Sequence, residues 1–125
     1  MNKHQLLERT KQFHIAVIKL CDQLPRGIAA YEIGRQLIRS AGSVGANYRA
    51  ACRAKSKPDF IYKIKVVLEE ADESLYWLQI LNEAKIITGE IINKLQKEAL
   101  ELVLIFNATD KTAKDNHTAI KSKNP

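Results

Sequence analysis

The chain has 125 residues, which is enough for one domain with a modest hydrophobic core. Hydrophobic residues make up 46% of the sequence while aromatic residues, glycine and proline are few, and this balance favours a helical protein over a sheet-rich one. No segment approaches the ~20 consecutive apolar residues of a membrane span, and the N-terminus lacks the apolar run of a signal peptide. We therefore expect a cytoplasmic protein without a membrane partner.

The first predicted helix ends near Gln23, just before the helix-breaking sequence Pro25-Arg26-Gly27. Its apolar residues recur at alternating spacings of three and four, as on one face of an amphipathic helix. These residues are Leu6, Thr10, Phe13, Val17, Leu20 or Cys21, and Leu24. His4 and His14 fall off this face, and we expect them to be ordinary surface or edge residues.

The second predicted helix runs from about Ile28 to about Ala54 and contains the run Ser40-Ala-Gly-Ser-Val-Gly-Ala46. Each glycine in a helix interior costs about 1 kcal/mol relative to alanine, so this run suits a place where a neighbouring backbone comes close. The alternative is a loop that divides two shorter helices. The apolar pattern continues in phase on both sides of the run, which favours one helix.

The third and fourth predicted helices follow a corner at Ala54–Asp59. Ser56 is a good N-cap there, Pro58 fits a first helical turn, and Asp59 resembles a capping-box partner. The third helix is expected from about Lys57 to Ala84, and the fourth opens at Thr88-Gly89-Glu90. We predict an all-α, up-down-up-down four-helix bundle over residues 1–108, followed by a polar, disordered tail over residues 109–125.

Several segments resemble one bacterial protein family. They are Ser40–Tyr48 (SAGSVGANY), Arg53–Lys57 (RAKSK) with Asp59-Phe60, and Glu69–Leu78 (EEADESLYWL). The family is that of the four-helix bundles named for intervening sequences of 23S ribosomal RNA genes. One of its branches reads S-I-P-A-N-I-A-E-G at the first segment. This chain instead has Gly45 and Ala50-Ala51, so no role of that glutamate is carried over.

The resemblance implies a cytoplasmic helical bundle with no established enzymatic activity, and it implies a homo-oligomer, since some family members form homopentamers. A distant relative in fold, the accessory protein of diversity-generating retroelements, is a basic nucleic-acid-binding partner of a reverse transcriptase. RNA or DNA is therefore an expected partner of this chain.

Positive charge is concentrated in the middle of the sequence. Eight basic residues face one acid between Arg35 and Lys65, a net charge of +7, whereas the whole chain carries +6. On a helical wheel Arg35, Arg39, Arg49 and Arg53 span an arc of about 80°. With the lysines of the corner they form the predicted nucleic-acid-binding surface, which would hold phosphates by electrostatics: Arg35, Arg39, Arg49, Arg53, Lys55 and Lys57.

The alternative is that this stripe pairs with the acids at 69–73 on a neighbouring helix or subunit, or with a protein partner, which would make the chain an interaction scaffold. Tyr76 and Trp77 are adjacent, so their side chains point about 100° apart and at least one should lie at a bundle edge. We assign them to a subunit interface.

The sequence offers no catalytic constellation, no metal-ligand spacing and no cofactor motif, so neither an enzyme nor a bound cofactor or metal is expected. No histidine stands three residues after a glutamate, as the di-iron bundles require. Cys21 and Cys52 lie at apolar helical positions without a CxxC spacing, which predicts buried reduced thiols.

Overall fold

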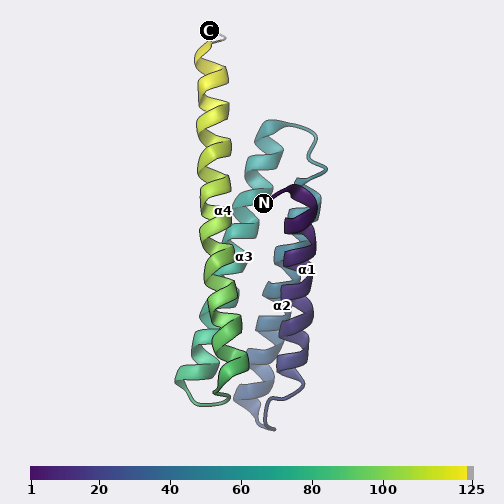
Figure 1. Ribbon diagram of the computed structural model, residues 1–125, viewed down its shortest axis with the longest axis vertical. Helices are drawn as coiled ribbons and strands as arrows, with labels where there is room; N and C mark the ends of the chain where they lie inside the picture. Colours follow the sequence, from purple (N-terminus) through teal and green to yellow (C-terminus); the bar gives the residue numbers. More distant parts are fainter. Residues whose placement is uncertain (124–125) are drawn as a thin grey trace.

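A computed structural model describes the backbone of residues 1–123 and the side chains of residues 1–118. It contains four helices, α1 (Lys3–Cys21), α2 (Ile28–Ala51), α3 (Lys57–Glu83) and α4 (Glu90–Lys123). Successive helices run in opposite directions and lie side by side (Figure 1). Packing is most extensive between α2 and α3 and between α3 and α4, and α1 closes the bundle against α4 with the smallest contact. The predicted up-down-up-down bundle is confirmed.

Helices α1 and α3 begin at a side chain that accepts a hydrogen bond from a backbone N–H of the first turn. At α1, Asn2 and Gln5 form a capping box, in which the Gln5 N–H donates to Asn2 Oδ1 over 2.8 Å and the Asn2 N–H donates to Gln5 Oε1 over 2.9 Å. At α3 the Asp59 N–H donates to the predicted cap, Ser56 Oγ, over 3.2 Å. Among the described helices, none is long and apolar enough to cross a membrane.

The core runs the length of the bundle and contains the residues that the periodic spacing predicts. Its fully buried members include Val17 and Leu20 of α1, Leu37 and Val44 of α2, and Phe106 of α4. Helix α2 is continuous, so the alternative of a loop at residues 40–46 is wrong. The two glycines of that run face α1, where Thr10 and His14 pack directly against the α2 backbone.

A small polar contact lies within the core between α2 and α3. Ser40 and Ser74 are both fully buried, and the Ser74 hydroxyl lies 2.9 Å from Ser40 Oγ. Each hydroxyl also has a carbonyl oxygen of its own helix within reach, Leu37 O for Ser40 and Glu70 O for Ser74. The contact between the two hydroxyls forms only when these turns of α2 and α3 lie opposite each other, so it favours this register.

The expected disordered tail differs from the structure, because α4 continues to Lys123 and extends past the rest of the bundle (Figure 1). The disordered tail was predicted from the polar composition of this segment alone. In the structure, however, the residues Asp110 and Ala113 are only 8% and 5% exposed. Lys114 donates to Asp110 Oδ2 over 2.8 Å, which adds a one-turn ion pair to the extension. Residues 124–125 of the expected tail lie outside the described part of the chain.

Candidate nucleic-acid interface

The structure divides the six predicted nucleic-acid-binding residues among different surroundings. Arg39 is bound to α3, where its guanidinium donates to Glu73 Oε2 and lies 3.5 Å from Glu70 Oε2. The hydrogen bond to Glu73 is the main cause of a raised Arg39 pKa. Glu73 also accepts from Trp77 Nε1 over 3.2 Å. At this position the arginine joins two helices of the same chain, as the alternative interpretation proposed for the stripe.

Arg35 makes only a local contact, 3.4 Å from Glu32 of its own helix, and both side chains are more than half exposed. Arg49 and Arg53 are different, because no carboxylate in the described residues lies within ion-pair distance of either guanidinium. Both line a groove between α1 and α2.

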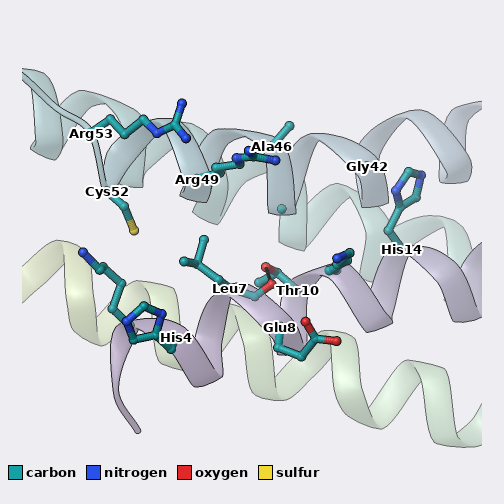
Figure 2. A pocket seen from close by; sticks show the side chains of 13 residues that line it. His4, Leu7, Glu8, Thr10, His14, Gly42, Ala46, Arg49, Cys52 and Arg53 are labelled. Carbon is teal, nitrogen blue, oxygen red and sulfur yellow. Dashed lines mark hydrogen bonds between the residues drawn. The ribbon is translucent and has the colours of Figure 1, made fainter.

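This α1–α2 groove has a volume of about 730 Å³, within the range of ligand sites in proteins. Arg49 of α2 and Arg53, which lies just past the end of that helix, line one side of the groove (Figure 2). Lys3 and Lys11 of α1 also line it. Glu8 is the one carboxylate among its described lining residues. The groove is therefore bordered by four fixed positive charges against one negative charge.

Small residues of α2 form the floor of the groove. Gly42, Gly45 and Ala46 carry little or no side chain, which lets α1 residues approach the α2 backbone. A Cβ atom at position 42 would lie 2.9 Å from both Cε1 and Nε2 of His14, closer than such atoms approach. Gly42 thus provides the space in which the His14 imidazole rests on α2, as Figure 2 shows.

Lys55 and Lys57 lie beside a second groove at the α2–α3 corner, which is also lined by Leu6, Phe60 and Thr109. Its volume is about 590 Å³, and Lys3 and Cys52 line both grooves. The predicted basic surface thus continues from the α1–α2 groove around the N-terminus of α1 to the corner.

The corner itself is held by Asp59. Its carboxylate accepts from Lys63 Nζ over 2.7 Å and from the Lys55 N–H over 3.2 Å. These two hydrogen bonds, the one from Lys63 first, lower the pKa of Asp59. The only acid of the basic segment is therefore engaged within the corner.

Sequence reasoning missed four residues of the groove, namely Lys3, His4, Lys11 and His14. The histidines were expected to be ordinary surface or edge residues of the first helix; His4 is exposed and His14 is half-buried, and both also line the groove. On a helical wheel of α1 all four residues fall on the polar side of the helix. Such a wheel could therefore have indicated that they share one surface.

The bundle closes on the far side of α1 through Arg9. Its Nε and Nη2 atoms donate to the two carboxylate oxygens of Glu98 over 2.8 Å and 2.7 Å, and Nη2 lies 3.4 Å from Glu101. This bidentate contact raises the pKa of Arg9, with the hydrogen bond to Glu98 as the main cause. It secures α1 to α4 and leaves the other side of α1 to the groove.

Tyr76 and Trp77 differ in burial, as expected for adjacent residues of one helix. Tyr76 is 52% exposed, whereas Trp77 packs against the core, and the two rings meet edge to face with centroids 5.0 Å apart. One aromatic residue therefore does lie at the bundle edge. Their assignment to a subunit interface stays a prediction.

The cysteines are free thiols, as expected, but they are half buried, whereas buried thiols were predicted. Burial raises the pKa of Cys21 to about 11, with the Asp22 carboxylate as a further cause. The pKa of Tyr48 is raised to about 12, chiefly by burial and further by the neighbouring Cys52. In the described residues, no three His, Cys, Asp or Glu side chains are grouped so as to hold a metal ion.

Comparison with known proteins places this fold in a family. The sequence profile of the 23S rRNA-intervening sequence proteins matches residues 2–108. A crystal structure of a protein with unknown function from the S23 ribosomal protein family of Bacteroides thetaiotaomicron is similar, with a TM-score of 0.80 and 29% identity. That similarity covers 89% of this chain and 99% of the other. Among curated proteins no significant match is found. The chain belongs to the 23S rRNA-intervening sequence protein family.

Proposed function

We propose that this protein is a non-enzymatic helical bundle that binds RNA or DNA through the α1–α2 groove and the adjoining corner. The observation that carries the proposal is the set of four basic residues that line one groove, Lys3 and Lys11 of α1 together with Arg49 and Arg53. Arginines without a carboxylate partner in the described residues retain all their donors for phosphate oxygens. The names of the family and of its structural neighbour both refer to the ribosome, which makes RNA the first probe.

The proposal is limited to electrostatic recognition of the backbone. The described lining of the α1–α2 groove contains no Phe, Tyr or Trp on which bases would stack, whereas Phe60 and Tyr48 line the adjoining corner. Electrostatic recognition is therefore assigned to the α1–α2 groove. Affinity should then depend steeply on salt and weakly on sequence, because phosphate neutralisation releases counterions.

The test is a fluorescence-anisotropy titration of short RNA and DNA at several salt concentrations. The variant Arg49→Glu/Arg53→Glu reverses the α2 wall, and Arg26→Glu/Lys97→Glu is the matched control, since it changes the net charge equally but neither residue lines a groove. We expect the groove variant to lose at least about tenfold in affinity and about 2 units of the salt slope, and the control to lose far less. Binding that ignores salt, or two variants that behave alike, would refute the proposal.

A second proposal concerns assembly into a homo-oligomer, for which a pentamer is the first expectation. It is supported by apolar side chains left on the surface, since Leu100 and Leu104 of α4 stand one helical turn apart and are 47% and 59% exposed. Tyr76 is a third exposed apolar residue, on α3. The scaffold alternative, in which the arginine stripe pairs with acidic residues of a neighbouring subunit or a partner protein, would then use Arg49 and Arg53, because Arg39 is already engaged by its own chain.

Light scattering tests the assembly directly. A mass several times that of the 14.1 kDa chain is expected, falling towards one chain in Leu100→Glu/Leu104→Glu. A wild-type protein that is monomeric at high concentration would contradict this second proposal without affecting the first.

A further inference from the structure

The two histidines of the α1–α2 groove are the feature that its basic walls do not explain. His4 and His14 both line the groove from α1. The His14 ring occupies space that the missing side chain of Gly42 leaves, since a Cβ atom would lie 2.9 Å from two of its ring atoms. Histidine is the side chain that changes its charge near neutral pH. The groove thus contains two groups that add positive charge beside a bound anion.

We propose that His4 and His14 are phosphate-contacting residues that make the groove bind polyanions more tightly as the pH falls. This inference rests on the proposed function and specifies which further residues hold the ligand. The ligand class is a phosphodiester chain, whose phosphates stay singly negative across the range in which histidine titrates.

The charges around the histidines determine the direction of the effect. Lys3, Lys11 and Glu8 of α1 line the groove with them, as do Arg49 of α2 and, just past the end of α2, Arg53 and the Cys52 thiol. The free groove thus carries four fixed cations and one carboxylate around the histidines. A bound phosphate chain neutralises those cations and attracts the imidazolium, so the occupied groove takes up protons more readily than the empty one.

Linkage makes this coupling reciprocal. If ligand binding promotes proton uptake, then added protons must tighten ligand binding by the same factor. Each protonated histidine that contacts a phosphate also displaces a further counterion, which steepens the salt dependence by about 0.7 units on a single strand. The proposal therefore predicts two independent changes, one in the dissociation constant and one in the salt slope.

The experiment measures binding of a rhodamine-labelled oligothymidylate, whose bases do not ionise in this range, at about pH 7.5 and about pH 5.5 over several salt concentrations. For the wild type we expect binding at the lower pH to be at least about fivefold tighter at equal salt, with a salt slope steeper by up to about 1.4. His4→Asn/His14→Asn should bind with the same affinity at both pH values. His117→Asn, on the extension of α4 and outside both grooves, should behave as the wild type.

Gly42→Ala gives a second test that keeps both histidines. The added methyl group displaces the His14 ring from α2, so roughly half of the pH response should be lost while His4 still contributes. Thermal unfolding followed by circular dichroism verifies that each variant is folded.

Salt-dependent wild-type binding that is equally tight at both pH values would overturn this inference and leave the proposed function standing. A pH response that persists in His4→Asn/His14→Asn would also overturn it. Absence of binding at both pH values and low salt would overturn the proposed function and this inference together.

Discussion

Arg39 and Arg49 lie on the same helix, yet the structure predicts opposite consequences for their loss. In Arg39→Ala, Glu73 keeps its hydrogen bond from Trp77, but the buried Oε2 atom of Glu70 loses the only cation within 4 Å in the described residues. A half-exposed ion pair contributes about 0.5 kcal/mol and a stranded buried oxygen about 1 kcal/mol, so we expect a loss of about 1.5 kcal/mol. For a chain of this length that lowers the melting temperature by roughly 6 °C.

Arg49→Ala should instead affect binding. Arg49 has no ion pair in the described residues, and a surface substitution of this kind changes the free energy of unfolding by less than about 0.5 kcal/mol. Its loss should reduce the salt slope of nucleic-acid binding by about 0.7 to 0.9. Differential scanning calorimetry and anisotropy titrations on the same two preparations provide both quantities. The reasoning fails if Arg49→Ala destabilises as much as Arg39→Ala, or if Arg39→Ala reduces binding equally.

Three further predictions concern the corner, the core and the groove. The pKa of Asp59 is lower in the folded than in the unfolded protein. The ionised carboxylate therefore stabilises the folded state fully above its ordinary pKa of about 3.9, and this stabilisation is lost as the pH falls through the lower folded-state pKa. Asp59→Asn should therefore be less stable than the wild type in urea unfolding at about pH 7, with the difference closing towards about pH 3; an unchanged gap would contradict the assignment. In the core, Ser40→Ala and Ser74→Ala should each cost about 1 kcal/mol and together about 1 rather than 2, whereas full additivity in a double-mutant cycle would exclude a shared hydrogen bond. In the groove, a bound polyanion should slow alkylation of Cys52 while leaving the slow reaction of Cys21 unchanged, as read by mass spectrometry; equal protection of both thiols would argue against groove occupancy.

The sequence was sufficient for the helices and the core because both depend on local signals. The spacing of Leu37, Val44 and their neighbours determines the buried face of α2, and Ser56 begins α3 through a side chain that acts on its own first turn. The end of α4 was not predicted, because composition does not reveal that Asp110 and Ala113 have packing partners.

The site was predicted only in part, because it depends on how the helices are rotated against one another. Arg39 and Arg49 stand about 80° apart around α2, which a helical wheel treats as one stripe. In the bundle α3 lies on one side of that stripe and α1 on the other, so Arg39 reaches a carboxylate of α3 while Arg49 lines the groove. Likewise, the position of His14 over Gly42 requires knowing which turn of α1 crosses which turn of α2.

The packing of α1 has a consequence for how the groove is maintained. One wall of the groove belongs to the helix that makes the smallest contact with α4, where Arg9 supplies the bidentate ion pair to Glu98. Undocking of α1 removes Lys3 and Lys11 from Arg49 and Arg53, so only the closed bundle presents the complete site. A ligand that binds only this form stabilises it, by about 2.7 kcal/mol at a free concentration 100 times its dissociation constant. Amide hydrogen exchange in α1 would then slow on binding, because the ligand holds the first helix in place.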